Sequence, residues 1–63
     1  MTYRVNLYRN ELLTESREHC KESFDNLLSR VRIMVDTGLA ECGEILDGDG
    51  HCLFKYRALK PDG

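Results

Sequence analysis

Hydrophobic residues recur at helical spacing in the middle of the chain, between Ser23 and Leu39. Each residue of a helix is rotated by roughly 100° from the one before. When these angles are counted from Phe24, four apolar side chains fall in one stripe, and Met34 flanks it. The stripe consists of Leu27, Leu28, Val31 and Val35. Its width is that of a helix face packed on a core, so the pattern predicts one amphipathic helix.

Both ends of this helix carry residues that commonly cap helices. Ser23 can accept a hydrogen bond from a free backbone N–H of the first turn, and Asp25 places negative charge there. Gly38 can adopt the left-handed conformation that ends a helix, which lets Leu39 fold back on the last turn as in a Schellman cap. Ser23 and Gly38 therefore bracket the helix.

Ile33 does not fit the stripe, because it projects opposite Phe24 and should lie in water. The interpretation we favour is a singly exposed apolar side chain, which is ordinary on protein surfaces. The alternative is that Ile33 contacts a partner or a second copy of the chain.

Apolar and polar residues alternate from Thr2 to Tyr8, which predicts a half-buried strand. Arg9-Asn10-Glu11 follows as a turn, since Asn tolerates the left-handed backbone of a tight hairpin. Leu12 to His19 is open to two interpretations. As an extension of the helix it would put Arg17 in the core, and an unpaired buried Arg is costly. We therefore expect a second strand, at a charged edge of the sheet.

Asp47-Gly48-Asp49-Gly50 predicts a tight turn between strands at Ala40–Asp47 and His51–Leu59. With Gly48-Asp49 at the tip, Ile45 would lie opposite Cys52 and Gly43 opposite Phe54. This register puts Cys52 on the core face.

These elements predict an α+β fold in the order β-hairpin, one α-helix, β-hairpin, in a single domain of residues 1–63. The helix should cover one face of a small antiparallel sheet, formed by Tyr3, Val5, Leu7, Ile45, Phe54 and Tyr56. A core of this size is thin, so help from a second chain, a metal or a disulfide deserves consideration.

Composition narrows the function classes only slightly. The net charge is -2 with both signs interspersed, so neither a polycationic tract nor an acidic tail is present. The sequence has no apolar run of the roughly 18 residues that span a bilayer, and Met1 to Asn10 lacks the pattern of a signal peptide. We expect a cytoplasmic protein without membrane contact, whose three cysteines are reduced thiols.

Cysteine and histidine residues raise the question of a zinc site. His19-Cys20 and His51-Cys52 are adjacent pairs, whereas structural zinc sites draw ligands two to four residues apart. Adjacent strand residues point to opposite faces of a sheet. We expect no metal or other cofactor, and the alternative ligand set is Cys20, Cys42, His51 and Cys52.

The same geometry argues against catalysis. His19 cannot readily act as base for its neighbour Cys20, because a nucleophile and its base need hydrogen-bond reach. Asp47-Gly48-Asp49-Gly50 resembles the start of a calcium loop but lacks its later acidic positions. We expect a turn at this position and a protein that is not an enzyme.

Arg4, Tyr8, Lys55 and Arg57 should lie on the sheet face away from the helix. If the first and last strands are neighbours, these residues form a basic and aromatic patch of the kind that stacks bases and holds phosphates. The more ordinary interpretation is a solvated face, which the acidic net charge favours.

In layout the chain resembles small phage-encoded proteins that inhibit host machinery, including certain anti-CRISPR proteins and a phage inhibitor of bacterial RNA polymerase. The shared features are a short hairpin beginning Tyr3-Arg4-Val5-Asn6-Leu7, a helix entered by Ser23-Phe24-Asp25-Asn26-Leu27-Leu28, and a returning strand. The resemblance implies a protein that occupies a partner surface without turnover.

We therefore rank first a non-enzymatic protein-interaction module, such as a phage-type inhibitor, that binds through a sheet edge or the open sheet face. Its candidate contact residues are Arg4, Tyr8, Ile33, Lys55 and Arg57, and a second copy of the chain is also a candidate partner. Nucleic-acid binding ranks second and a metal-stabilised regulator third.

Overall fold

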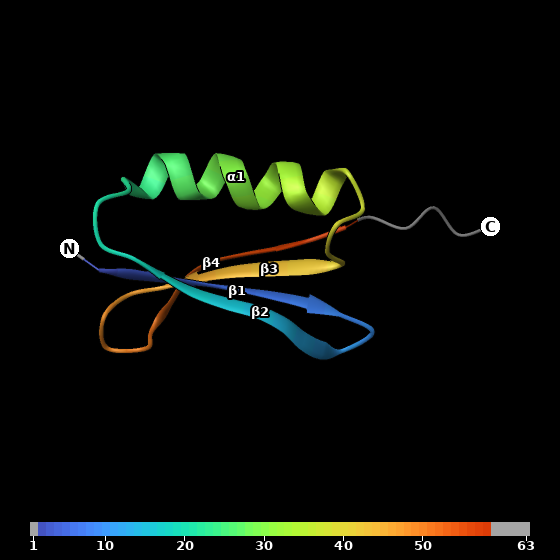
Figure 1. Ribbon diagram of the computed structural model, residues 1–63, viewed down its shortest axis with the longest axis horizontal. Helices are drawn as coiled ribbons and strands as arrows, with labels where there is room; N and C mark the ends of the chain where they lie inside the picture. The colour runs from blue at the N-terminus through green and yellow to red at the C-terminus, as the bar shows by residue number, and fades with distance from the viewer. Residues whose placement is uncertain (1, 59–63) are drawn as a thin grey trace.

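A computed structural model describes residues 2–58, which form four strands and one helix in the predicted order (Figure 1). The elements are β1 Tyr3–Arg9, β2 Leu12–His19, α1 Phe24–Asp36, β3 Cys42–Leu46 and β4 Cys52–Arg57. The α+β fold of hairpin, helix and hairpin is thereby confirmed. Leu59, the predicted end of the last strand, lies outside the described residues.

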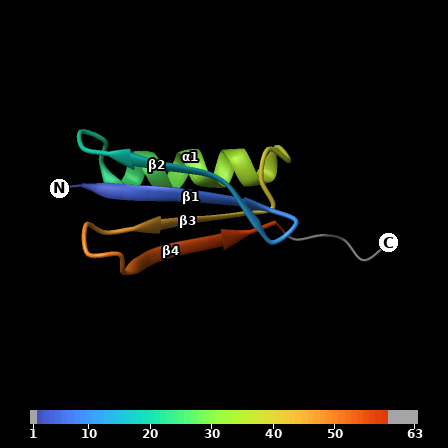
Figure 2. The same ribbon diagram turned by 60° about the horizontal axis from the view of Figure 1, so that its bottom comes forward.

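The strands form one antiparallel sheet in the order β2-β1-β3-β4 (Figure 2). The two hairpins join through β1 and β3, where Val5 lies opposite Ile45. The helix lies along one face and makes its contacts with β1, β3 and β4 (Figure 1). In the described part of the chain, β2 and β4 are the edges and the second face carries no covering layer.

The core lies between the helix and the central strands, as the helical stripe predicts. Its buried members are Val5, Leu7, Leu27, Val31, Val35, Ala40 and Ile45. Half-buried side chains surround them, among them Tyr3, Phe24, Leu28, Met34, Phe54 and Tyr56. Ile33 is 62% exposed, which confirms that it lies outside the stripe.

The helix ends where the capping residues predict. The Ser23 hydroxyl accepts a hydrogen bond from the Asn26 N–H at 3.2 Å. At the other end Gly38 has φ +86°, its N–H donates to the Val35 carbonyl, and the Leu39 N–H donates to the Met34 carbonyl at 3.0 Å. This is the hydrogen-bond pattern of a Schellman motif. The Leu39 side chain, however, is 68% exposed, so the apolar half of the predicted cap was wrong.

Leu12 to His19 is a strand and not an extension of the helix, which confirms the argument from Arg17. The first hairpin turns at Asn10 and Glu11, which have φ +53° and +66°. Positive φ at both central positions is the geometry that matches the twist of the flanking strands. Glu11 therefore holds a backbone conformation that costs a residue with a side chain roughly 1–2 kcal/mol.

The predicted register of the second hairpin was wrong by two residues. Ile45 lies opposite Phe54 and Gly43 opposite Tyr56. Part of the displacement arises in the turn, where the Asp47 N–H donates to the His51 carbonyl and Gly50 takes φ +89°. The loop thus holds three residues instead of two. The rest arises from an irregularity in the pairing between Ile45 and Leu46.

Each offset moves the strand by one residue and so reverses its faces, and two offsets restore them. Phe54 and Tyr56 consequently remain on the helix side, as predicted. Cys52 lies between the two offsets, pairs with Leu46 and is exposed, so its predicted place in the core was wrong. Cys42 is the buried cysteine.

Gly43 has no side chain, and the helix packs directly against the backbone of the sheet at this position. A Cβ built there would stand 2.6 Å from Val31 Cγ1 and 3.1 Å from Leu7 Cδ2. Both neighbours are buried in the core and cannot swing into solvent.

We therefore expect Gly43→Ala to destabilise the protein by about 1–3 kcal/mol through overpacking. Urea unfolding monitored by circular dichroism measures the change. Gly48→Ala is the matched control, because the nearest atom to a Cβ there is the Thr2 carbonyl oxygen at 3.9 Å. Equal stability of the two variants would contradict the close approach of helix and sheet.

Glu11→Gly should stabilise the protein by about 0.5–1 kcal/mol, because glycine removes the steric cost of positive φ. The greater conformational entropy of glycine in the unfolded chain offsets part of this gain. The same unfolding measurement applies. Glu15→Gly in β2, where the backbone is extended, should instead lower the free energy of unfolding by about 0.5–1 kcal/mol. Loss of stability in Glu11→Gly would show that the left-handed turn is not the one formed in solution.

Candidate functional site

The predicted basic and aromatic patch is divided by a strand. Arg4 and Tyr8 lie on β1, Lys55 and Arg57 lie on β4, and β3 runs between them. The premise that the first and last strands are neighbours was therefore wrong. The error concerns strand order. The helix connects β2 to β3, and where this connection places β3 in the sheet is not determined by any local sequence pattern.

Glu44 of β3 occupies the centre of the open face. Its Oε1 atom accepts hydrogen bonds from the Tyr8 hydroxyl at 2.5 Å and from the Asn6 amide at 3.2 Å. Towards β2, Arg4 pairs with Glu18 and donates to Ser16. The middle of the face is thus a hydrogen-bonded network with an acidic centre, and not a continuous basic surface.

The hydrogen bond to Glu44 raises the pKa of Tyr8 above its ordinary value of 10.0, with further contributions from partial burial and from the carboxylate's charge. A raised pKa means that folding favours the neutral phenol. The corresponding contribution to stability is complete below pH 10.0 and is lost as the pH rises through the folded pKa of Tyr8.

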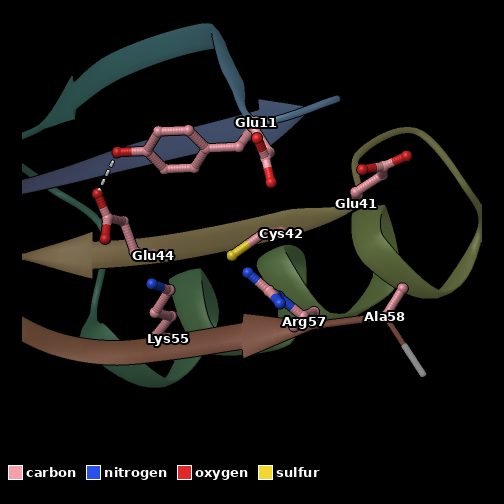
Figure 3. Close-up of a pocket in the computed structure, with 8 residues that line it drawn as sticks. Glu11, Glu41, Cys42, Glu44, Lys55, Arg57 and Ala58 are labelled. Atoms are coloured by element: carbon pink, nitrogen blue, oxygen red, sulfur yellow. Dashed lines mark hydrogen bonds between the residues drawn. The ribbon is translucent and has the colours of Figure 1, made fainter. Parts of the chain in front are cut away.

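Beside this network the open face is hollowed at the end where β1 finishes (Figure 3). The hollow has a volume of about 590 Å³. Its lining residues are Tyr8, Glu11, Glu41, Cys42, Glu44, Lys55, Arg57 and Ala58. Cys42, which is 7% exposed, forms part of the floor on β3.

The charges around the hollow are divided by side. Lys55 and Arg57 extend from β4 along one wall, and the carboxylates stand on the turn, the β3 entry and β3 itself (Figure 3). Glu44 is engaged by Tyr8, and Glu41 accepts from the Asn10 backbone N–H at 3.2 Å. Neither cation of β4 forms an ion pair with a residue between 2 and 58. The hollow therefore offers two unneutralised cations to an anionic group.

No histidine is among the residues that line the hollow. Cys42 thus lacks there the imidazole that commonly activates a thiol nucleophile. The charged and hydroxyl groups of the lining residues can bind charged and hydrogen-bonding groups of a ligand or partner.

The alternative metal ligands are not brought together. Cys42 begins β3, opposite Tyr8, whereas Cys52 begins β4 and lies opposite Leu46 at the other end of β3. Cys20 follows the end of β2, and His51 lies in the second turn. Across residues 2–58, the potential ligand atoms that do converge belong to Asp47, Asp49 and His51, within 4.8 Å of one another.

This cluster is explained by the turn itself. Asp47 Oδ1 accepts hydrogen bonds from the backbone N–H groups of His51 and Asp49, each at 2.9 Å. The bond from His51 lowers the pKa of Asp47 below its ordinary 3.8, with a further contribution from the Asp49 N–H. Asp47 thus favours the folded turn above pH 3.8, and this effect is lost as the pH falls through its folded pKa.

Ile33 lies on the helix, which covers the face of the sheet opposite to the open one (Figure 1). Of the predicted contact residues, the structure brings Tyr8, Lys55 and Arg57 to one hollow and leaves Arg4 and Ile33 elsewhere. Sequence reasoning missed Glu44, and it named Cys42 only as an alternative metal ligand. The alternation of Cys42, Gly43, Glu44 and Ile45 carries the relevant pattern, but only a known strand order turns it into a site.

Comparison with known proteins yields no match to a family model, to a curated protein or to a solved structure. Between residues 2 and 58 there is no helix with both the length and the apolar character needed to cross a membrane.

Glu44→Gln should return the pKa of Tyr8 towards 10.0, because the substitution replaces the charged acceptor of the Tyr8 hydrogen bond with a neutral amide and removes the carboxylate's charge from the phenol. NMR titration of tyrosine labelled with carbon-13 in the ring measures the shift, and Glu18→Gln, on the far side of β1, is the control. An unchanged Tyr8 titration in Glu44→Gln would contradict the hydrogen bond at the centre of the open face.

Proposed function

We propose that this protein is a non-enzymatic interaction module that binds a protein partner through the open face of its sheet. The observation that carries the proposal is the pair of cations on β4, exposed beside a hollow and without an ion pair among residues 2–58. Charged side chains that no intramolecular partner neutralises are available for complementary charges on a partner.

The distribution of apolar side chains supports binding without turnover. The buried core serves the contact between helix and sheet, and the hollow is open and lined mostly by charged side chains. An enclosed, water-excluding cavity is what catalysis by preorganised charges requires. An open face with fixed hydrogen bonds suits recognition.

A phage-type inhibitor, such as an anti-CRISPR protein or an inhibitor of host RNA polymerase, is the form of this function that the layout of the chain favours. Such a protein acts by occupying a surface of its target. The rigid network around Glu44 supports this role, because preorganised side chains lose little conformational entropy on binding.

A second copy of the chain is a further candidate partner. Ile33 is 62% exposed on the helix, and the helix covers the face of the sheet opposite to the open one (Figure 1). A homodimer through the helix would thus leave the hollow accessible. Nucleic acid ranks below a protein partner, since Glu44 interrupts the basic surface that phosphates would follow.

Affinity capture from host lysate with the immobilised full chain tests the proposal. Lys55→Glu/Arg57→Glu should abolish the capture of a partner that the unmodified protein retains, because the substitution inverts both cations of the hollow. Arg17→Glu/Arg30→Glu changes the net charge equally on β2 and the helix, away from the hollow, and should retain the partner.

Equal capture by both double variants would refute binding through the open face. Circular dichroism of each variant verifies that it is folded. Native mass spectrometry of the unmodified protein reports in the same preparation whether it is a monomer or a dimer, and Ile33→Ser should convert a dimer formed through the helix to a monomer.

A further inference from the structure

The β4 strand lies at the edge of the sheet, with β3 on one side and, among residues 2–58, no strand on the other (Figure 2). Its bounds are Cys52–Arg57. An uncovered edge presents backbone N–H and C=O groups that can pair with a further strand. The side chains beside those groups decide which strands it accepts.

Backbone pairing shows which residues of β4 face outward. The Asp47 N–H donates to the His51 carbonyl, and the Ala58 N–H donates to the Glu41 carbonyl at 2.9 Å, at the two ends of the β3–β4 ladder. Hydrogen-bonded and non-bonded pairs alternate along an antiparallel ladder. Counting from Ala58, the residues whose backbone groups point away from β3 are Arg57 and Lys55.

The outward backbone positions are thus the ones that carry the free cations. Lys55 and Arg57 are exposed, lie two residues apart and project from the same open face. A strand added at this edge would place alternate side chains directly opposite them. Two positive charges at those positions favour acidic side chains at both.

On the helix side the same edge is aromatic. Phe54 and Tyr56 are half-buried, with their rings stacked at 6.2 Å between centroids. The Tyr56 hydroxyl donates to Asp36 at 2.8 Å, and Arg32 lies over the Tyr56 ring, so the ring is fixed in place. The residue of an added strand between its two acids would lie beside this ring, which favours an apolar side chain there.

We infer that β4 binds an extended acidic segment of a protein partner by strand addition, with an acid–apolar–acid pattern read by Lys55, Tyr56 and Arg57. The inference rests on the proposed function and names the partner's chemistry and its mode of binding. Main-chain hydrogen bonds supply affinity in this mode, and the alternating side chains supply specificity.

The same charges exclude a second copy at this edge. Antiparallel pairing of β4 with itself about Tyr56 places Lys55 opposite Arg57 twice, and like charges directly opposite each other oppose pairing. The other edge, β2, differs in kind. It carries both signs, with Arg17 beside Glu15 at 3.6 Å and Glu18 paired to Arg4, so it offers no uniform charge to a partner.

Titration of the nitrogen-15-labelled full chain with two synthetic peptides tests the inference. One is capped and has Glu-Val-Glu at its centre, and its counterpart has Lys-Val-Lys in the same flanking sequence. The acidic peptide should shift the backbone amide resonances of β4 saturably, the largest changes falling at Lys55 and Arg57. The basic peptide should leave them unchanged.

Lys55→Glu/Arg57→Glu should reverse the preference: the affinity for the acidic peptide should fall by roughly tenfold or more, and the variant should bind the basic peptide. Arg17→Glu/Arg30→Glu, with the same change of net charge, should keep the preference of the unmodified protein. Should the first variant fail to fold, the preference of the unmodified protein between the two peptides decides alone.

Three results would overturn the inference: no shift of β4 amides by the acidic peptide up to about 10 mM, larger shifts on β2 than on β4, or an equal loss in both double variants. These results leave the proposed function distinguishable. Capture of a partner that depends on the hollow, without acidic-peptide binding at β4, would retain the interaction module and reject strand addition.

Discussion

The contact between Gly43 and Val31 is the constraint on which the arrangement of the protein depends. Because Gly43 has no side chain, the helix can lie directly over the central strand β3, and Val31 fills the space that a Cβ would take. Neighbouring positions on a strand face opposite sides. The placement of Gly43 and Ile45 under the helix therefore sends Cys42 and Glu44 to the open face, where they form the floor and centre of the candidate site. The core and the site are two sides of the same five-residue strand.

Features set by local chemistry could be predicted from the sequence. Ser23 and Gly38 mark the helix ends because capping involves backbone groups only a few residues away. The strand at Leu12–His19 followed from a single energetic argument, the cost of burying Arg17. The exposure of Ile33 followed from its angle on the helix. Each of these predictions needs only the segment in which the residue lies.

Features set by distant segments could not be predicted. The hollow joins the first turn, β1, β3 and β4, and their adjacency depends on β3 inserting between β1 and β4. Without knowledge of that order, the sequence predicts one continuous patch of Arg4, Tyr8, Lys55 and Arg57, and it assigns no role to Glu44. The error at Cys52 has a related cause. The sequence Asp47-Gly48-Asp49-Gly50 signals a turn, but it does not say whether Gly50 belongs to the loop or to the strand.

The two offsets in the second hairpin impose a counting rule on its length. One offset at Gly50 and one between Ile45 and Leu46 together keep Phe54 and Tyr56 under the helix. A change of one residue in this hairpin, unless absorbed by another bulge, would present Lys55 and Arg57 to the core and both aromatic rings to water. A change of two residues would preserve the sides. Insertions and deletions in this loop are thus expected to change its length by even numbers of residues. Loop length, and not only residue identity, then determines which side chains of β4 face the helix and which face the open side.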